Sequence, residues 1–364
     1  MHVAIIGGGQ LARMLALAGW PMGIKFSFLV EQDESIQCVE GLGTIVRLDS
    51  SHTPQQIFED LGQPDLVTVE RESVDVVLLK GLGEFCPAYP NERAVWLSQN
   101  RIREKEFLRS LSIPTADFFG FHGGDSIESQ ISMPVVIKST EFGYDGKHQW
   151  LIKTEDDLKA FQALGLEGEF IAESWVPFDK EVSMIAARSV NGEVCCYPLT
   201  ENVHKQGILS TSIAPAEGLT DALENKAEGY AQKILEEMDY VGVLAVECFQ
   251  VGDQLLVNEL APRVHNSGHW TQNGSLNSQF ENHLRALCGF PLGDTSVSGY
   301  TGMVNILGGN KLPSSEELIA SHANVHWYNK TPKMGRKLGH VNLNYADLGE
   351  LKQAMQAVLA TVDD

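Results

Sequence analysis

Two acidic residues, Glu247 and Glu259, lie in adjacent apolar stretches that a Gly-Asp pair separates. This pattern predicts a β-hairpin of two strands, Val243–Val251 and Gln254–Glu259. A turn centred on residue 253 sets Glu247 opposite Glu259. Two carboxylates that face each other on a largely apolar hairpin repel, and burying them unpaired costs several kcal/mol or forces one of them to bind a proton. A hard divalent cation such as Mg²⁺ removes this conflict, since it takes carboxylates together with phosphate oxygens. The hairpin therefore predicts a metal–phosphate site; the alternative is that both side chains face water.

Residues suited to binding a nucleotide lie where two other predicted strands end. Lys138 closes the apolar strand 135–138 and is followed by a glycine-containing loop, 139–148. A lysine in this place suits the α/β-phosphates of ATP, with the amides of the loop over the phosphates; a hairpin with a surface lysine is the alternative. Strand 169–173 ends in Glu173, an acid before Ser-Trp-Val, and such an end suits a slot for adenine and ribose.

Polar and cationic residues gather in two loops of the second half of the chain. The loop after the hairpin holds Arg263, His265, Asn266 and His269. The later loop holds Lys330, Lys333, Arg336 and Lys337. In a chain of formal net charge −21 these cations form a local patch. They could clamp a phosphate monoester, with Gly335 allowing close approach of the backbone; a basic surface turn is the alternative.

The elements that position these residues begin with an alternation of strands and helices. Strands are predicted at 2–6, 26–30 and 65–69, with helices from Gln10 to about Ala18 and near 54–61. The turn Gly7–Gln10 fits G-x-G-x-x-A and predicts either a phosphate contact at the helix N-terminus or only a tight turn. Glu70-Arg71-Glu72 follows the last strand, at the carboxyl edge where open α/β sheets bind ligands. Either one of these acids meets substrate or the loop is solvated.

The remaining elements follow from periodicity and from start and stop signals. A charged amphipathic helix at 100–110 ends at Ile113-Pro114, and this marks the boundary of the first domain. Further helices are predicted near 155–163, 220–238, 278–287 and 347–361. Further strands are predicted at 149–152, 181–189, 193–199 and 300–307, with 181–189 and 193–199 as an antiparallel pair. His204, just beyond this pair, is either a polar contact to a nucleotide or a surface residue.

Length and composition limit the class of protein. With 364 residues, two or three domains are expected, and 43% hydrophobic with 21% charged residues is ordinary for a globular protein. The negative charge argues against nucleic acid or an anionic membrane as partner. The six cysteines show no C-x-x-C pair or disulfide framework, so reduced thiols in a cytoplasmic protein are expected. No apolar run is long enough to span a bilayer, and the amino terminus does not read as a signal peptide.

Four motifs together resemble the ATP-grasp superfamily, and within it the 5-(carboxyamino)imidazole ribonucleotide synthetases of purine biosynthesis, over essentially the full chain. They are GGGQLARM at 7–14, GYDGK at 143–147, NELAPRVHNSGHWT at 258–271 and GRKLGH at 335–340. The resemblance implies a mixed α/β and α+β fold of three domains. These are an N-terminal Rossmann-like preATP-grasp domain at 1–100, an ATP-grasp domain at 101–295 with a lid at about 115–200, and a C-terminal domain at 296–364 that completes the substrate site.

The resemblance also implies the reaction. ATP phosphorylates bicarbonate to carboxyphosphate, and the amine of 5-aminoimidazole ribonucleotide captures the carboxyl group, giving a carbamate, ADP and phosphate. The metal is Mg²⁺ or Mn²⁺, held by Glu247 and Glu259, and a cytoplasmic homodimer is implied.

Residues at the matching positions take the roles that the family assigns. ATP would contact Arg101, Lys138, Gly143, Tyr144, Asp145, Gly146, Lys147, His148, Gln149, Glu173, Ser174, Trp175, Val176, Glu181, His204, Asn258 and Glu259. The ribonucleotide and the carboxyl group would contact Gln10, Glu72, Tyr144, Asp145, Arg263, His265, Asn266, Lys330 and Arg336. Asp145, Tyr144, Arg263 and His265 would be catalytic, with Asp145 orienting the substrate amine or accepting its proton.

The chain departs from the family pattern at three positions, where Ala12, Phe142 and His148 replace glycines. A bulkier lid loop would close differently over the nucleotide. In addition, the neighbours Asn258 and Glu259 point to opposite faces of a regular strand, so both line one site only if the strand bends or ends there.

Other functions compete with this interpretation. A formate-dependent ribonucleotide transformylase or a biotin-carboxylase-like subunit would share ATP and metal but differ around 263–269 and 330–336. A nicotinamide-dependent oxidoreductase would use the first glycine turn and leave the paired glutamates unexplained. A non-catalytic nucleotide-binding module is the third alternative.

Overall fold

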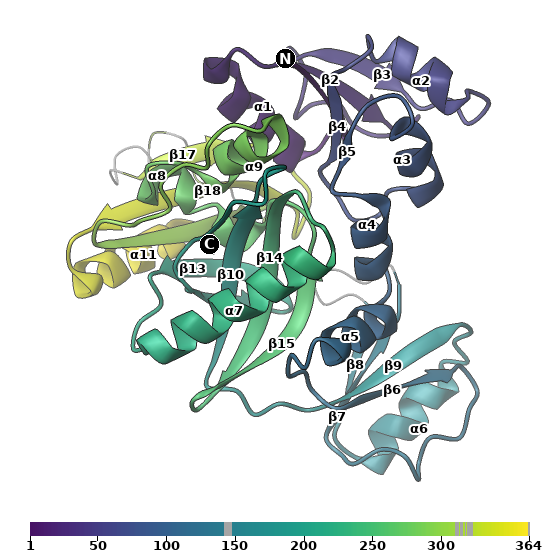
Figure 1. Ribbon diagram of the computed structural model, residues 1–364. Helices are drawn as coiled ribbons and strands as arrows, with labels where there is room; N and C mark the ends of the chain where they lie inside the picture. The colour runs from purple at the N-terminus through teal and green to yellow at the C-terminus, as the bar shows by residue number, and fades with distance from the viewer. Residues whose placement is uncertain (142–147, 310–312, 314–315, 317, 319–322, 363–364) are drawn as a thin grey trace.

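Three β-sheets organise the part of the chain that the computed structural model describes, which is residues 1–141, 148–309, 313, 316, 318 and 323–362. Figure 1 shows the amino-terminal sheet at one end of the molecule, a small sheet at the other, and a large sheet beside both. The lid loop at 142–147, with Phe142, Gly143, Tyr144, Asp145, Gly146 and Lys147, lies outside the described residues.

The amino-terminal sheet is parallel, with the strand order β3-β2-β1-β4-β5. Its strands are β1 (His2–Ile6), β2 (Lys25–Val30), β3 (Thr44–Arg47), β4 (Leu66–Val69) and β5 (Ala88–Tyr89). Its helices are α1 (Gln10–Gly19), η1 (Trp20–Met22), α2 (Pro54–Asp60), α3 (Val76–Leu82) and α4 (Glu92–Ser98). Val3 and Ile5 belong to one hydrophobic cluster and Ala4 and Ile6 to another, so β1 is buried on both faces. Burial on both faces is typical of a doubly covered α/β sheet.

The small sheet is antiparallel with the order β6-β9-β7-β8, and it is the lid sheet. Its elements are β6 (Phe118–His122), β7 (Val135–Ser139), β8 (Gln149–Ile152), α6 (Glu155–Ala163) and β9 (Glu169–Ser174). Phe121, Trp150, Phe161 and Phe170 pack edge to face or stacked between α6 and the strands. The lid sheet, expected within about 115–200, spans 118–174, and the strands that follow belong to the large sheet.

The large sheet has the order β15-β14-β10-β12-β13-β16-β18-β17, with β11 paired to β10. Its strands are β10 (Lys180–Arg188), β11 (Val194–Cys196), β12 (Thr200–Lys205), β13 (Ile208–Ala214), β14 (Gly242–Val251), β15 (Gln254–Ala261), β16 (Tyr300–Leu307), β17 (Asn324–Trp327) and β18 (Lys337–Tyr345). Its helices and helical turns are α5 (Arg101–Ser110), α7 (Asp221–Glu237), η2 (Asn266–Gly268), α8 (Thr271–Gly274), α9 (Gln279–Cys288) and α11 (Leu348–Val362). The predicted mixture of α/β and α+β architecture is confirmed.

Helices on the two faces of the large sheet connect it to the rest of the chain. On one face α7 packs against β10 and β14 and α5 packs against β15, and Figure 1 shows α7 lying across β10 and β14. On the other face α9 packs between the large sheet and α1 of the amino-terminal sheet. Through α9 the carboxyl ends of β1 and β4 are fixed relative to the β14–β15 hairpin.

His283 of α9 hydrogen-bonds both sheets. Its Nδ1 accepts from the Val243 amide at 3.0 Å, so Nε2 carries the proton and donates to Thr68 Oγ1 at 2.9 Å. Burial lowers the pKa of this imidazole to about 3. The ring is therefore neutral in the folded protein at neutral pH.

Acid is expected to destabilise the protein through His283. Its folded pKa of about 3 lies below the ordinary value of 6.5, so its stabilising contribution is complete above pH 6.5 and is lost as the pH falls from there toward 3. In that window one such group lowers the free energy of unfolding by up to about 1.4 kcal/mol per pH unit. We expect His283→Gln to lose less stability between pH 7 and pH 4.5 than the native protein, measured by urea unfolding. His122→Gln, at an exposed position, is the control, and equal losses in all three proteins would contradict this role.

Most predicted elements are present, with ends within one or two residues. The strands and α-helices not predicted are β3, β5, β6, β12, β13, β17, β18, α3, α4 and α8, and the short helical turns η1 and η2 were not predicted either. The predicted pairing of 181–189 with 193–199 holds only for the short β11, while β12 takes the place beside the start of β10.

All six cysteines are free of disulfides. Within the part of the chain that the structure describes, none of the helices has the length and apolar character needed to cross a membrane.

Candidate active site

Glu247 and Glu259 are directly paired across the β14–β15 hairpin, as predicted. The predicted reason was wrong. The two-residue turn pairs Val251 with Gln254, and a regular ladder from there would set Glu247 opposite Asn258. A register shift next to Glu247 makes Asn258 the extra residue of a β-bulge and brings Glu259 into the pair. The same bulge interrupts the strict alternation of faces, which removes the geometric objection to Asn258 and Glu259 serving one site.

Electrostatic conflict at this pair is visible in its pKa. The Glu247 side chain is 16% exposed. Burial raises the pKa of Glu247 to about 8, and the nearby charge of Glu259 adds to the rise. A cation placed between the two carboxylates would reverse this effect.

His265 orients the Glu247 carboxylate. Its Nε2 lies 3.0 Å from Glu247 Oε1, and its Nδ1 accepts from the Ser267 amide at 3.3 Å. Burial, together with the charge of Arg263, holds the pKa of His265 well below its usual range, so the neutral ring donates from Nε2. His265 thus accompanies the Glu247–Glu259 pair as a neutral hydrogen-bond donor.

A chain of buried hydroxyl and amide groups supports this loop from the large sheet. Ser267 Oγ bonds Ser183 Oγ at 2.8 Å, Asn202 Nδ2 donates to Ser183 Oγ at 2.9 Å, and Ser212 Oγ donates to Asn202 Oδ1 at 2.7 Å. Because the members of such a network satisfy one another, it fixes the position of the 263–269 loop.

The lid sheet contributes a second charged group. Glu173, at the end of β9, is 4% exposed and is held by Lys138 Nζ at 2.6 Å and Lys105 Nζ at 3.0 Å. Burial alone would raise the pKa of Glu173, but Lys138 and then Lys105 outweigh burial and lower it to about 2. Glu173 and Lys138, both predicted at the nucleotide, are therefore neighbours joined by an ion pair.

The other predicted nucleotide residues surround the lid and its connection to the large sheet. Arg101 begins α5 and donates to the Ser139 carbonyl at 3.2 Å. His148 adopts a φ of 56°, and Gln149 pairs with Lys138 across β8 and β7. Ser174 ends β9, while Trp175, 42% exposed, and Val176 lie in the connection to β10. On the large sheet His204 Nδ1 bonds Glu181 Oε2 at 2.7 Å, and although burial lowers the pKa of His204, this carboxylate raises it overall.

A half-buried ion pair joins the 263–269 loop to the amino-terminal sheet. Arg263 Nη2 lies 2.5 Å from Glu72 Oε1, and Arg263 Nη1 donates to the Val264 carbonyl at 3.0 Å. Burial lowers the pKa of Arg263, but Glu72, Glu247 and Glu259 outweigh it, so Arg263 lies within electrostatic reach of the paired glutamates. Of the predicted acids at 70–72, Glu72 is therefore the one that faces the site.

Asn266 is the clearest sign of a missing polar ligand. Both Nδ2 and Oδ1 are buried and lack a hydrogen-bond partner in the structure. Buried amide groups are normally bonded, so a polar ligand at this loop would satisfy them.

Glu70 and Glu34 cap the first glycine turn. The amides of Gly9 and Ala12 donate to Glu70 at 2.7 and 2.9 Å, and the Gly8 amide donates to Glu34 at 2.9 Å. A side chain at Gly9 would meet Glu70 Oε1 at 2.6 Å, so glycine is required there for this contact. Of the two predicted roles of the turn, the structure favours the tight turn, and these amides are not open to a dinucleotide.

The predicted cation patch lies in the loop between β17 and β18. Lys330 Nζ donates to Gln10 Oε1 at the start of α1, and Arg336 donates to the Thr331 carbonyl at 3.1 Å. Burial lowers the pKa of Lys330, and the nearby charges of Arg336 and Lys337 act in the same direction. A bound anion would relieve this repulsion, so the patch fits a phosphate group.

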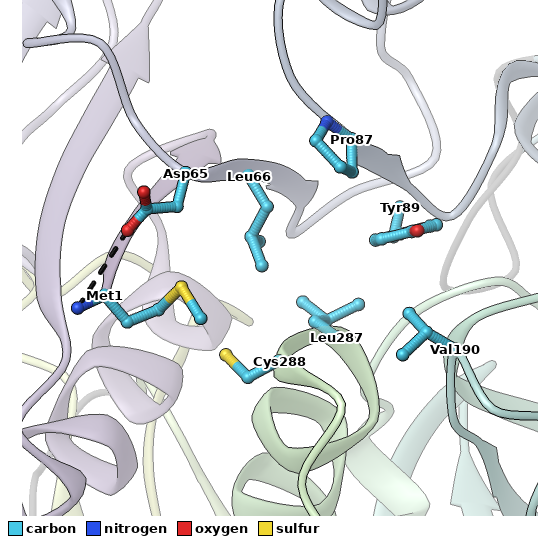
Figure 2. A pocket seen from close by; sticks show the side chains of 8 residues that line it. All are labelled: Met1, Asp65, Leu66, Pro87, Tyr89, Val190, Leu287 and Cys288. Carbon is cyan, nitrogen blue, oxygen red and sulfur yellow. Dashed lines mark ion pairs between the residues drawn. The ribbon is translucent and has the colours of Figure 1, made fainter.

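A cavity of about 420 Å³ lies elsewhere, at the junction of the amino-terminal sheet and α9. Figure 2 shows Leu287 and Cys288 at the end of α9 facing Leu66 and Pro87, with the Met1 ammonium 3.9 Å from Asp65. Met1 lies at the amino end of β1, and Asp65 and Leu66 lie at the amino end of β4. The cavity is thus at the opposite edge of the sheet from Glu72 and takes no part in the site.

Several residues of the site were not predicted from sequence. Glu104 and Lys105 were assigned to an ordinary charged helix, and Ser183, Asn202, Ser212 and Ser267 carried no motif signal. A weak signal existed for Lys105, because it shares a helix face with Arg101 and with buried Leu108.

Models of known protein families match three parts of the chain. The ribonucleotide synthetase preATP-grasp domain matches residues 1–99, the ATP-grasp domain 106–280, and the phosphoribosylaminoimidazole carboxylase C-terminal domain 301–354. The ATP-grasp match includes the lid sheet, the strands β10–β15 of the large sheet and the paired acids of the β14–β15 hairpin, so this part of the chain is an ATP-grasp domain.

Relatives narrow this class to one family. N5-carboxyaminoimidazole ribonucleotide synthase of Pseudomonas aeruginosa is 41% identical over 100% of both chains. The crystal structure of the Thermus thermophilus synthetase has a TM-score of 0.91 at 42% identity and covers 100% of this chain and 99% of that one. The Aspergillus clavatus synthase in complex with ADP and 5-aminoimidazole ribonucleotide has a TM-score of 0.88 at 28% identity, covering 100% and 98%. The chain belongs to the N5-carboxyaminoimidazole ribonucleotide synthase family, which confirms the resemblance, and the transformylase and oxidoreductase alternatives are not supported.

Proposed function

We propose that this chain uses ATP to carboxylate 5-aminoimidazole ribonucleotide, forming N5-carboxyaminoimidazole ribonucleotide, ADP and phosphate in purine biosynthesis. The observation that carries the proposal is the half-buried pair Glu247 and Glu259, within electrostatic reach of Arg263. Family membership and the Aspergillus clavatus complex with ADP and the same ribonucleotide support the choice of substrates.

The carboxyl group would come from bicarbonate in two steps. Bicarbonate oxygen attacks the γ-phosphate of ATP, and the bond to ADP breaks, giving carboxyphosphate. The substrate amine then attacks the carboxyl carbon, phosphate leaves and the amine loses a proton. Because carboxyphosphate hydrolyses readily, the site must hold it out of water, and Arg263 and His265 would bind it there.

The residues present fit a magnesium ion. Glu247 and Glu259 offer hard oxygen donors, and burial of the pair is unfavourable without a cation. Among the described residues no group of three or more His, Cys, Asp or Glu side chains forms a complete metal site. This agrees with an ion that takes two carboxylates and completes its shell with phosphate oxygens and water. When bound, Mg²⁺, or Mn²⁺ in its place, would neutralise phosphate charge.

The other site residues divide between the nucleotide and the ribonucleotide. Lys138 and Arg101 would bind the nucleotide phosphates, and Glu173 the ribose hydroxyls. Glu72 and Asn266 would orient the ribonucleotide, with its phosphate at Lys330, Arg336 and Gln10. The proposed roles of Tyr144 and Asp145, in substrate closure and proton transfer, rest on the motif resemblance alone.

The test is ADP release at fixed Mg²⁺, with and without bicarbonate and 5-aminoimidazole ribonucleotide. We expect ADP release to require bicarbonate, with one carbamate formed per ADP when the ribonucleotide is present. Release that continues in CO₂-free buffer, or that formate supports equally well, would refute the proposal.

Lys330→Met should weaken binding of the ribonucleotide and leave ATP binding unchanged. Charge-assisted hydrogen bonds to a phosphate contribute roughly 1.5–3 kcal/mol, so KM for the ribonucleotide should rise about 10- to 100-fold. Steady-state kinetics, with each substrate varied in turn, measure KM for the ribonucleotide and KM for ATP separately. Lys233→Met, at an exposed position of α7 outside the cation patch, is the control, and an equal rise of KM for ATP in Lys330→Met would contradict a phosphate role.

We also propose the division into domains at 1–100, 101–295 and 296–364, action as a homodimer, and a cytoplasmic location. The domain division is supported by the three family matches, and the location by the free cysteines. Light scattering of the purified protein tests the dimer.

A further inference from the structure

Two adjacent charged side chains of α5 are almost completely buried. Glu104 is 3% exposed and Lys105 is 2% exposed. Glutamate and lysine are rarely buried to this degree unless they are paired or bonded. The groups that these two side chains bond therefore explain how they can be buried.

Both side chains bond the backbone of β15 on either side of Glu259. The Leu260 amide donates to Glu104 Oε2 at 3.1 Å, and Lys105 Nζ donates to the Asn258 carbonyl at 3.1 Å. These two peptide groups flank the point where the hairpin register shifts. Glu104 and Lys105 therefore hold β15 at its bulge.

The bulge decides which residue faces Glu247. The register that the two-residue turn sets would place Asn258 there, and a one-residue slip moves a side chain to the other face of the sheet. Repulsion between Glu247 and Glu259 favours such a slip. The bonds from α5 oppose it.

Lys105 also reaches the lid sheet. The same ammonium lies 3.0 Å from Glu173 Oε1, while Lys138 Nζ lies 2.6 Å from Glu173 Oε2. One buried cation thus contacts the end of β9 in the lid and the bulge of β15 in the large sheet. The geometry connects the proposed ribose and phosphate contacts to the proposed metal ligands.

We infer that Glu104 and Lys105 are positioning residues that hold Glu259 opposite Glu247, and that Lys105 couples the lid carboxylate Glu173 to this hairpin. The inference rests on the proposed role of Glu247 and Glu259 in binding Mg²⁺ with the nucleotide. Neither α5 side chain contacts the reacting atoms.

Two substitutions of Glu104 distinguish the loss of its hydrogen bond from a change in the size of its side chain. Glu104→Gln keeps an oxygen for the Leu260 amide, whereas Glu104→Met keeps the length and loses the acceptor. Removing support for a metal ligand typically costs 10- to 100-fold in metal affinity. Mg²⁺ should increase the affinity of the native protein for ADP. In Glu104→Met we expect this increase to be at least about tenfold smaller. ADP affinity in EDTA should be unchanged, and Glu104→Gln should behave as the native protein. Calorimetry with ADP measures both affinities.

Hydrogen exchange gives a readout that does not depend on ligands. In the ligand-free full-length protein, the peptide covering 254–261 should exchange faster in Glu104→Met than in Glu104→Gln. If Glu104→Met does not fold, Glu104→Asp, whose shorter side chain cannot reach the Leu260 amide, replaces it. Native exchange together with a native Mg²⁺ effect in the folded variant would overturn the inference.

Lys105→Met should lower ADP affinity both with and without Mg²⁺, because it releases Glu173 and the bulge together. In the double variant with Lys105→Met and Glu173→Gln, the loss of ADP affinity should be smaller than the sum of the two single losses, since the two residues share one bond. KM for the ribonucleotide should not change. Additive losses, or equal losses for every ligand with a lower unfolding midpoint, would show a merely structural role.

Glu247→Gln separates failure of this inference from failure of the proposed function. If Glu247→Gln itself leaves the Mg²⁺ effect on ADP binding intact, the metal assignment is wrong. If it abolishes that effect while Glu104→Met preserves it, the metal assignment stands and the positioning role of Glu104 is wrong.

Discussion

Replacing Glu259 with glutamine is expected to lower the rate of carboxylation by about a thousandfold while leaving the folded protein at least as stable. A metal that neutralises charge at a transferring phosphoryl group contributes several kcal/mol, and about 4 kcal/mol corresponds to three orders of magnitude in rate. Glu247→Gln should show a similar loss. Its amide oxygen can still accept from His265 Nε2, so the loss reports the missing negative charge rather than a displaced loop.

The stability readout distinguishes this loss from unfolding. In the metal-free protein the two carboxylates repel, and burial raises the pKa of Glu247 to about 8. Removing one charge relieves that conflict, so the thermal midpoint in EDTA should stay the same or rise. In excess Mg²⁺ the native midpoint should rise above that of either variant by linkage to binding.

Glu228→Gln, at an exposed position of α7, is the matched control and should retain native rate and Mg²⁺ dependence. Variants of Glu247 and Glu259 that keep the native rate, or that respond to Mg²⁺ as the native protein does, would remove the hairpin from the mechanism.

The β14–β15 hairpin also shows which features of the site could be predicted from the sequence. Apolar periodicity and the Gly-Asp turn identified both strands, but the turn alone sets Glu247 opposite Asn258, and the facing glutamates were predicted correctly only because the assumed register was one residue off. The bulge at Asn258 could not be predicted, because it depends on bonds from Glu104 and Lys105, residues about 150 positions earlier in the chain. A local pattern carries no information about such a partner.

Buried polar residues explain the clearest missed strand, β18. His340 and Asn342 are fully buried there, and their ring and amide groups bond Tyr328 and the His269 carbonyl at 2.6 and 3.0 Å. Residues 335–340 were assigned to the basic patch and no strand was predicted at 341–345, although polar and apolar residues alternate from His340 to Asn344 as they do in a strand. Periodicity detects burial only when the buried residues are apolar.

The basic and acidic site residues were predicted through motifs rather than geometry. Arg263, His265 and Glu72 come from two separate regions, and only the fold shows that Glu72 pairs with Arg263 while Glu70 caps the first helix. The choice among the acids at 70–72 therefore required the packing of α9 between the two sheets.

Arg263→Lys is expected to uncouple ATP use from carboxylation. The guanidinium reaches Glu72 with Nη2 and the Val264 carbonyl with Nη1, which leaves its position fixed. A lysine keeps the charge but offers a single nitrogen, so it cannot hold both partners and present a planar fork to carboxyphosphate. Losing one such oriented donor costs roughly a hundredfold or more in rate.

The decisive measurement is the ratio of carbamate formed to ADP released. In the native protein this ratio should be near one, whereas in Arg263→Lys carboxyphosphate should escape to hydrolysis and the ratio should fall well below one. KM for ATP should change little, because Arg263 bonds none of the predicted nucleotide residues that the structure describes. Arg285→Lys, whose arginine bonds Glu281 at 2.8 Å on α9, is the matched control and should keep the native ratio.

Glu72→Gln tests whether Glu72 and Arg263 act as one unit. It leaves Arg263 buried beside a neutral partner, so the double variant should lose less than the sum of the single variants if the two side chains act as one unit. A native product ratio in Arg263→Lys, or fully additive losses with Glu72→Gln, would show that this ion pair only joins the two sheets and takes no part in capturing the carboxyl group.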